Sequence, residues 1–450
     1  MRRRYLRSVS RASSILGYVA LSLAAAACGR AETEASGPAD KGSTPSGDPT
    51  DSLRCAGCHP DAYQAWSLSM HAYAGDDAIF LAMNARGQRE TRGQLGQFCV
   101  RCHAPLAVAR GATVDGTNLE QLPAALRGVT CVVCHTATRD ENASLVLAED
   151  GVMRGPLADA IANPVHDSAY SPSLDRGQPE SAAMCGTCHA VTNGHGLQVE
   201  RTLDEWRATT YSEPASLRTC GRCHMPESTG VAAAVVGAPP RRVHGHAMPG
   251  VDLGSALPAQ TRLVQETLDP AISSKLCVIP DVGGAAVRVT LANDRMGHSW
   301  PSGATQDRRA WLELVAYAGN VVVYASGVAA DDEAVATSAN PPLVLLREQL
   351  ADENGNPTLF MWDARTAQSQ LLETAAADPA QSTVTAAVRV SGLVDRVTSR
   401  VRVRPIDHDV ADALVASGDL SPDATSPLTT LTVGATVLEW TSDRGPACLP

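Results

Sequence analysis

The pattern with the most chemistry in this sequence is Cys-x-x-Cys-His, which occurs five times between residues 55 and 224. The copies are Cys55, Cys58 and His59; Cys99, Cys102 and His103; Cys131, Cys134 and His135; Cys185, Cys188 and His189; Cys220, Cys223 and His224. Two thiols three positions apart can bond the two vinyl groups of one haem, and the adjacent histidine can bind the iron. The sequence therefore predicts five covalent c-type haems, with ten attachment cysteines and five proximal histidines.

Zinc is the main alternative for such motifs, because zinc knuckles also combine paired cysteines with histidine. Five copies with the histidine always at the same offset, in a chain that begins with an export-like segment, favour haem. Elsewhere the sequence has no nucleotide-binding loop, Ser/His/Asp grouping or His-Glu-x-x-His element. We therefore expect the chemistry of this chain to reside in its haems.

The histidines outside the motifs decide what those haems could do. An iron with histidine on both axial sides only exchanges electrons, whereas an open axial position can bind a small molecule. Seven histidines are available: His71, His166, His195, His244, His246, His298 and His408.

We expect His71 and His166 to be distal iron ligands, together with at least one of His244 and His246. His244 and His246 would share a face in an extended segment, so one of them could be only a hydrogen-bonding neighbour of the ligand or a surface residue. His195 is a further candidate. His298 precedes a Pro-Ser-Gly turn, which favours a structural role in a loop and leaves it as a reserve ligand. His408 lies between two aspartates and is expected in solvent.

The elements that must position these residues change character near residue 250. Before it we predict a helix over 60–71, a loop over 153–172, and a helix opened by a capping box of Thr202 and Glu205. After it the apolar residues alternate with period two, which is typical of strands. Strands are predicted at 287–291, 311–317, 321–326, 384–390, 396–404 and 429–440, with Gly319 and Asn320 as a tight turn. So many short alternating strands favour an antiparallel sandwich.

The chain has 450 residues, of which only 4% are aromatic, and this is low for two independent hydrophobic cores. Porphyrins could supply the missing apolar surface. We therefore predict a multidomain protein in which a mainly α/loop multihaem cytochrome c domain is followed by an all-β sandwich domain. The predicted segments are a lipoprotein signal peptide (1–27), a flexible tether (28–53), a pentahaem domain (54–250) and a β-sandwich domain (251–450).

Three of the thirteen cysteines lie outside the motifs. Cys28 follows an apolar run and three alanines, as at a lipoprotein processing site, so we expect a lipid on Cys28 that attaches the protein to a membrane. Cys277 and Cys448 bracket the predicted strands, and in an oxidising compartment they are expected to form a disulfide. These features predict an exported lipoprotein of the periplasm or outer membrane, with the cell surface as a further option.

Several of these motifs occur in a recognisable context, which includes Cys-His-Pro-Asp-Ala-Tyr at residue 58, Trp66, Ser69-Met-His71, and Cys220-Gly-Arg-Cys-His-Met-Pro. The stretch from about residue 53 to 250 resembles the multihaem c-type cytochromes related to the tetrahaem electron carrier of nitrifiers and, more distantly, hydroxylamine oxidoreductase. That resemblance implies that His71 is a distal ligand, usually of a neighbouring haem. The segment 297–311 is similar to the β-rich tail of larger multihaem cytochromes. The fifth motif and this tail depart from the nitrifier carrier.

The net charge of −11 understates the acidity, because five of the arginines lie in the expected export signal, so nucleic acid is a poor candidate partner. We expect an electron-transfer protein with mostly bis-histidine haems, whose partners are redox proteins that include other multihaem cytochromes. One alternative is an oxidoreductase that acts on a small nitrogen or sulfur oxo-species at one open haem. Another is a subunit of an extracellular cytochrome conduit.

Overall fold

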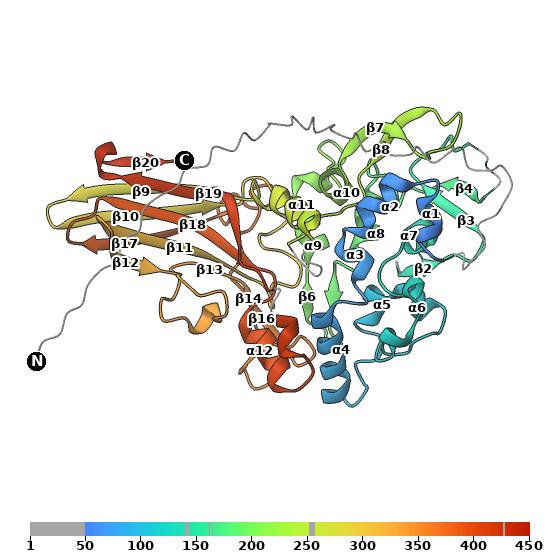
Figure 1. Ribbon diagram of the computed structural model, residues 1–450, viewed down its shortest axis with the longest axis horizontal. Coiled ribbons are helices and arrows are strands. Elements are labelled where there is room, and N and C mark those ends of the chain that lie inside the picture. Colours follow the sequence, from blue (N-terminus) through green and yellow to red (C-terminus); the bar gives the residue numbers. More distant parts are fainter. Residues whose placement is uncertain (1–49, 140–143, 162, 164, 252–256, 426–427) are drawn as a thin grey trace, which may run out of the picture. The chain divides into compact units, whose positions relative to one another are not determined.

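The computed structural model describes residues 50–139, 144–161, 163, 165–251, 257–425 and 428–450 (Figure 1). The predicted signal peptide, Cys28 and nearly all of the tether lie outside the described residues. These described residues all belong to one compact unit. Among the described helices, none is both long and apolar enough to cross a bilayer.

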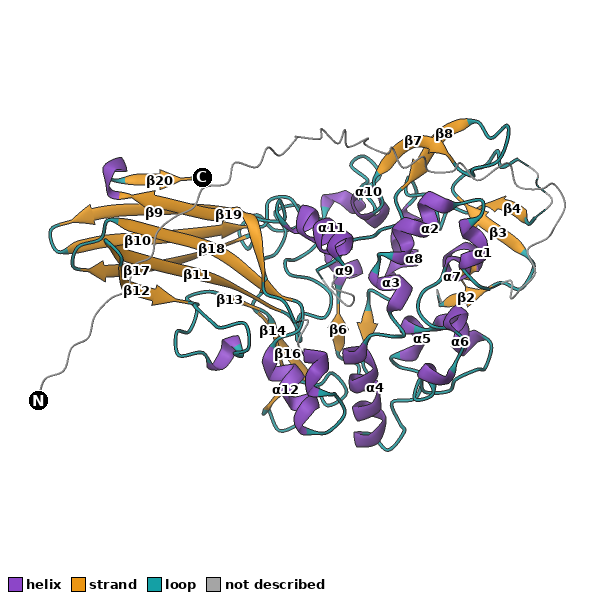
Figure 2. Cartoon of the chain, viewed as in Figure 1, coloured by secondary structure: helices purple, strands orange, loops and turns teal. Residues whose placement is uncertain are grey.

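The first half of the chain forms short helices joined by loops (Figure 2). Proline occupies the first turn of α2, α6 and α8, where its missing N–H costs nothing and its fixed φ suits a helix. The helices are α1 (Leu53–Ala56), α2 (Pro60–Ser67), α3 (Met70–Tyr73), α4 (Ala78–Glu90), α5 (Val100–His103), α6 (Pro105–Ala109), α7 (Cys131–Thr136), α8 (Pro179–Gly186), α9 (Thr202–Arg207) and α10 (Cys220–His224), with 3-10 turns η1 (Leu119–Gln121), η2 (Ala124–Leu126) and η3 (Thr210–Ser212).

The single helix predicted over 60–71 is interrupted between α2 and α3. Ser69 has an extended backbone, and its hydroxyl donates to the carbonyl of Trp66 at 2.7 Å. A serine side chain that bonds the nearby backbone in this way competes with helical hydrogen bonds. The break separates α3, which carries His71, from α2.

The loop predicted over 153–172 is also wrong in part, because β3 (Val152–Gly155) and β4 (Asp167–Tyr170) pair in parallel within it. Strands this short contain too few residues to show a periodicity. The other short ribbons of this half are antiparallel: β1 (Ala137–Arg139) with β2 (Leu145–Leu147), β5 (Val191–Thr192) with β6 (Gln198–Glu200), and β7 (Glu227–Val231) with β8 (Pro240–His244).

The second half contains two larger antiparallel sheets, so the predicted antiparallel β region is confirmed (Figures 1 and 2). One sheet has the order β17-β10-β9-β20: β17 (Thr383–Ser391), β10 (Gly284–Ala292), β9 (Ser273–Asp281) and β20 (Ala447–Leu449). The other has the order β12-β11-β18-β19, with β13 also on β11: β12 (Val321–Ser326), β11 (Arg309–Ala318), β18 (Arg396–Arg404), β19 (Leu431–Thr441) and β13 (Leu345–Leu346).

The remaining elements of this half are smaller. A three-stranded sheet has the order β15-β14-β16: β15 (Pro357–Thr358), β14 (Glu348–Ala351) and β16 (Thr366–Ser369). Two helices and three 3-10 turns complete the half: α11 (Pro258–Leu268), α12 (His408–Ala416), η4 (Val335–Thr337), η5 (Pro422–Thr425) and η6 (Ser442–Arg444).

Both larger sheets contribute to one hydrophobic core. Val287 and Leu291 of β10 belong to the same buried cluster as Leu312 of β11 and Trp440 of β19. Alternate residues of each strand enter this cluster, as expected for strands that bury one face. The finer assignment as a sandwich stays a prediction that the shared core supports.

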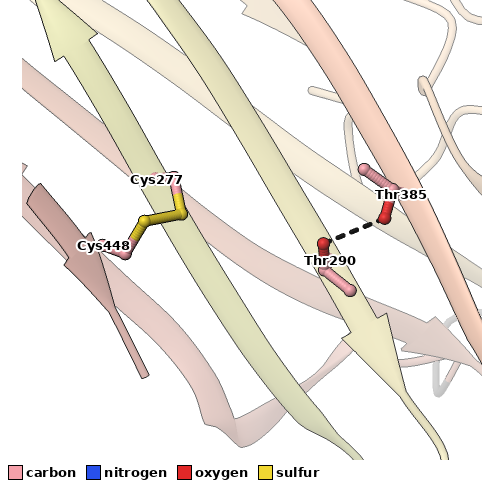
Figure 3. Close-up of a disulfide and its surroundings, with 4 residues drawn as sticks. All are labelled: Cys277, Thr290, Thr385 and Cys448. Carbon is pink, nitrogen blue, oxygen red and sulfur yellow. Dashed lines mark hydrogen bonds between the residues drawn. A yellow bond between two sulfur atoms is a disulfide. The ribbon is translucent and has the colours of Figure 1, made fainter.

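The predicted disulfide is present between β9 and β20 (Figure 3). Cys277 and Cys448 are directly opposite in the antiparallel register and are separated by 171 residues in the sequence. Figure 3 also shows the hydroxyls of Thr290 and Thr385 in contact at 2.9 Å across β10 and β17. The disulfide therefore ties the last strand of the chain to the first strand of the β region.

Candidate haem-binding sites

Each Cys-x-x-Cys-His motif, numbered 1 to 5 in chain order, forms a single helical turn. In motif 1 the backbone N–H groups of Cys58 and His59 both donate to the carbonyl of Cys55, at 3.1 and 2.7 Å. The same two hydrogen bonds recur in motif 2 and motif 4, and motifs 3 and 5 lie in α7 and α10. One turn therefore presents both sulfurs and the imidazole together, as attachment to one porphyrin requires.

The rings of four motif histidines are oriented by backbone carbonyls. The Nδ1 atom of His59 lies 2.7 Å from the Ala232 oxygen, and that of His135 lies 2.6 Å from the Arg154 oxygen. The corresponding contacts in motifs 2 and 5 are made to Ala74 at 3.0 Å and to Pro249 at 3.2 Å. A carbonyl that accepts the Nδ1 proton leaves Nε2 as the basic nitrogen, which is the nitrogen available to a metal.

Four motif histidines each face a second histidine at nearly the same separation. The ring centroids are 6.4 Å apart for His59 and His166, 6.3 Å for His71 and His189, 6.4 Å for His135 and His246, and 6.4 Å for His224 and His298. The structure thus brings His71, His166, His246 and His298 opposite motifs 4, 1, 3 and 5. The Nδ1 atoms of His166, His246 and His298 also lie near backbone carbonyls, at 3.1, 2.9 and 2.8 Å.

This separation fits one iron between two imidazoles. A bond from a metal to imidazole nitrogen is about 2 Å long and the nitrogen lies about 1 Å from its ring centroid, so two rings on opposite sides of one metal lie about 6 Å apart. A zinc site would instead need four ligands to converge in a tetrahedron around one point. Two opposed rings at each of these four motifs match axial ligation of a haem.

The second motif differs from the other four. His103 faces no other histidine of the chain, all twelve of which are described. Instead the ring of Phe80, in α4, stacks on His103 with centroids 3.9 Å apart and an angle of 2° between the planes. A parallel ring at this distance lies beside the imidazole, so Phe80 is not opposite His103. Because none of the twelve described histidines faces His103, no histidine would complete the coordination of an iron at motif 2.

The other histidines are held elsewhere. His195 uses Nε2 to contact the carbonyl of Trp362 at 3.0 Å, and His408 uses Nε2 to contact the carbonyl of Asp331 at 2.6 Å. His408 is buried, so its predicted exposure to solvent is wrong. His244 ends β8 and forms no ring pair with a motif histidine. Its carbonyl instead accepts the contact from Nδ1 of His246.

Burial keeps several of the facing imidazoles, those of motifs 3, 4 and 5, in the form that binds metal. Burial, and then the charges of neighbouring histidines, lowers the pKa of both His71 and His189 to about 4. Burial also lowers the pKa of His135, His224 and His298. A neutral imidazole is the species that binds metal, so these residues need not lose a proton when they ligate iron.

The pKa values of the cysteines indicate which motifs are neighbours. The pKa of a thiol in one motif is shifted by a thiol of another motif in three places: Cys55 with Cys131, Cys102 with Cys188, and Cys185 with Cys220. Burial, and then the charges of Cys131 and Cys188, raise the pKa of Cys134 to about 12, which indicates that motif 4 lies near motif 3. Motif 4 therefore adjoins motifs 2, 3 and 5, while motif 1 adjoins motif 3.

The helix α9 between motifs 4 and 5 forms as predicted, but its capping box does not. Glu205 accepts hydrogen bonds from the hydroxyl of Ser302 at 2.7 Å and from the N–H of Ser299 at 3.2 Å. The hydroxyl of Thr202 also contacts that of Ser302, at 2.8 Å. The two residues that would have capped α9 instead hold the loop that carries His298. Hydrogen bonds to the distant residues Ser299 and Ser302 have replaced the predicted local hydrogen bonds at the start of α9.

Comparisons with known proteins give one sequence match and one structural match. Residues 54–136, which contain motifs 1 to 3, match the family model of cytochrome c554 and c-prime. The fold is similar to that of a penta-haem cytochrome c552 from Thermochromatium tepidum, with a TM-score of 0.59 and 22% sequence identity over 86% of this chain and 97% of that one. A comparison with the curated proteins finds no match. The cytochrome-like first half and the β-rich second half thus occur together in a known fold.

Proposed function

We propose that this protein is a multihaem c-type cytochrome that carries electrons through five covalently bound haems. The observation that carries the proposal is the set of four facing histidine pairs, each at 6.3–6.4 Å and each containing one motif histidine. A haem iron cycles between ferric and ferrous states, and two imidazoles saturate it so that it only exchanges electrons. The family-model match and the structural likeness support the same class of protein.

The neighbour relations of the motifs give the proposed order of electron transfer. Motif 1 adjoins motif 3, motif 3 adjoins motif 4, and motif 4 adjoins both motif 5 and motif 2. Motifs 1 and 5 are then the two ends of a path, and motif 2 is a branch from motif 4. Because neighbouring motifs lie close enough for their thiols to shift one another's pKa, electrons would pass between the haems without a conformational step.

A second candidate function is favoured by motif 2. No histidine of the chain faces His103, so an iron bound there would keep an open axial position. Such a haem could bind a small nitrogen or sulfur oxo-species. Electrons for its conversion would arrive through motif 4. Both roles use the same electron path through motifs 1, 3, 4 and 5. They differ only in whether the haem of motif 2 converts a substrate.

The remaining parts of the proposal rest on the sequence. They are an export signal, a lipid on Cys28, a periplasmic or outer-membrane location, and exchange of electrons with redox partner proteins that include other multihaem cytochromes. The kinship with the nitrifier tetrahaem carrier and with hydroxylamine oxidoreductase also belongs to the proposal. The match to the family model over residues 54–136 supports it.

Haem counting combined with spin-state spectroscopy tests the proposal. Mass spectrometry of the purified protein should show five haem additions, and electron paramagnetic resonance of the oxidised protein should show four low-spin haems and one high-spin haem. The high-spin signal alone should change when cyanide or nitrite is added, since only motif 2 offers an open position. Fewer than five additions would remove a motif from the proposal. Five low-spin haems would exclude the oxidoreductase role.

A further inference from the structure

The surface around motif 5 carries positive charge in a chain that is acidic overall. Arg222 lies within the motif, between Cys220 and Cys223, and Arg218 precedes it by two residues; both are exposed. The side chain of Arg242, in β8, is 79% exposed. Cys223 is exposed as well. An edge of the fifth haem would therefore lie at a surface lined by Arg218, Arg222 and Arg242, here called the arginine face.

Carboxylates offset the charges of this face only in part. In the described part of the chain Arg218 and Arg222 form no ion pair, and Arg218 instead lies over the ring of Tyr211 at 5.2 Å. The acidic neighbours are Glu227, which pairs with the half-buried Arg176 and lies 3.8 Å from Arg242, and Asp175, which like Arg222 approaches Gly177.

The opposite end of the electron path carries exposed acidic residues. Asp61 follows the motif 1 histidine by two residues, and Asp167 is adjacent to His166, which faces that histidine. Both aspartates are exposed, and neither forms an ion pair in the described residues. An edge of the first haem would lie among these acids. The two terminal motifs therefore offer different electrostatic environments to a partner.

We propose that the arginine face is a docking surface for an acidic redox protein that exchanges electrons with the haem of motif 5. The proposal rests on the electron-transfer function above. Complementary charge steers a partner into encounter and can raise the association rate by about 10- to 1,000-fold at low salt. Guanidinium groups also suit carboxylates in particular, because they bind both oxygens at once. The acidic surroundings of motif 1 would repel the same partner.

Electron-transfer rates with charged probes test the assignment in the haem-loaded protein. The test variant is R218E/R222E, and the control is R262E/R288E, which changes the net charge equally at exposed positions on α11 and β10. Stopped-flow oxidation of the reduced protein is followed with anionic ferricyanide and with cationic hexaammineruthenium(III). Reduction is followed with an acidic plant-type [2Fe–2S] ferredoxin.

At low ionic strength we expect R218E/R222E to slow the reactions with ferricyanide and ferredoxin by about tenfold or more, and the control to slow them much less. The reaction with the ruthenium complex should persist or accelerate, and high salt should remove the differences. Equal effects of the two variants would overturn the proposal, since net charge alone would explain them. A loss with ferricyanide but not with ferredoxin would also overturn it. An unchanged haem spectrum with no electron transfer to any probe would instead contradict the electron-transfer function.

Discussion

Structural histidines differ from candidate iron ligands in which imidazole nitrogen is hydrogen-bonded to a backbone carbonyl. His59, His135, His246 and His298 direct Nδ1 at a carbonyl, whereas His195 directs Nε2 at one. Some of these carbonyls are remote in sequence, as for His59 and Ala232, which are 173 positions apart. The sequence could thus supply the set of candidates, but the choice among them depends on tertiary contacts that no local pattern encodes.

Two neighbouring histidines offer a matched test of this distinction. His246 faces His135 at 6.4 Å, while His244 does not face a motif histidine. We expect His246→Ala to convert one low-spin haem to high-spin and to shift its reduction potential, because the iron loses an axial ligand. His244→Ala should leave the number of low-spin haems unchanged. Electron paramagnetic resonance and a redox titration of both variants check this.

The reverse result, a new high-spin signal in His244→Ala alone, would mean that the ring of His244 is the ligand when haem is bound. An unchanged signal in both variants would mean that motif 3 has some other distal ligand. Haem content measured in parallel shows whether either variant has simply lost a cofactor.

At the scale of elements, the six predicted strands formed as β10, β11, β12, β17, β18 and β19, whereas β9 and the small ribbons were not predicted. Residues 396–404 alternate apolar and polar side chains, and β18 has those bounds, because one face of the strand is buried in a common core. In contrast β3 and β4 have four residues each, and their pairing depends on the contacts around motif 3. The helix α9 formed without its predicted capping box because Glu205 bonds Ser299 and Ser302 instead.

The disulfide between β9 and β20 gives a prediction for the stability of the β region. Reopening a loop of 171 residues should restore much conformational entropy to the unfolded chain. For loops this long the entropic estimate is about 4 to 5 kcal/mol, less any strain in the folded state. We expect the double variant Cys277→Ser, Cys448→Ser to lower the free energy of unfolding by a large part of that amount.

Guanidinium unfolding followed by tryptophan fluorescence measures the effect. Thr290→Val is the control, because it removes only the hydroxyl contact with Thr385 and should cost less than about 1 kcal/mol. Adding a reductant should destabilise the wild type as the double variant does, and leave the double variant unchanged. A double variant as stable as the wild type would show that the β region does not depend on this covalent link.

At the scale of the whole molecule, the two halves meet through polar contacts that cross residue 250. Asn193 donates to the carbonyls of Met361 and Ala364 at 2.8 and 2.9 Å, and Trp362 donates to Glu90 at 3.0 Å. The spacing of apolar residues in the sequence changes near residue 250. This spacing predicts which face of a helix or strand is buried, but it does not predict which residues of the two halves are in contact. The placement of His298 opposite His224 could be found only from such contacts.

A buried carboxyl on the β side of this junction predicts how the stability of the molecule depends on pH. Asp307 is 4% exposed, and its Oδ1 has no hydrogen-bond partner among the described residues. Burial raises its pKa from 3.8 to about 7, although Arg309 opposes the shift. Between these values the unfolded chain loses this proton and the folded protein keeps it. The folded state binds more protons there, so the free energy of unfolding falls as pH rises from about 4 to 7.

Replacing Asp307 with asparagine should remove this part of the pH dependence. The difference between a pKa of 3.8 and one of about 7 corresponds to at most about 4 kcal/mol in the free energy of unfolding. In the variant Arg309 would lose a nearby negative charge, and this loss makes the increase in stability smaller. We expect Asp307→Asn to gain stability relative to the wild type as pH rises from 4 to 7, measured by guanidinium unfolding of the haem-loaded protein. Asp443→Asn, at an exposed carboxyl whose pKa is lowered mainly by a hydrogen bond from Thr441, should show no such gain. Parallel stability curves for Asp307→Asn and the wild type would mean that Asp307 is ionised in the folded protein, with Arg309 compensating its burial.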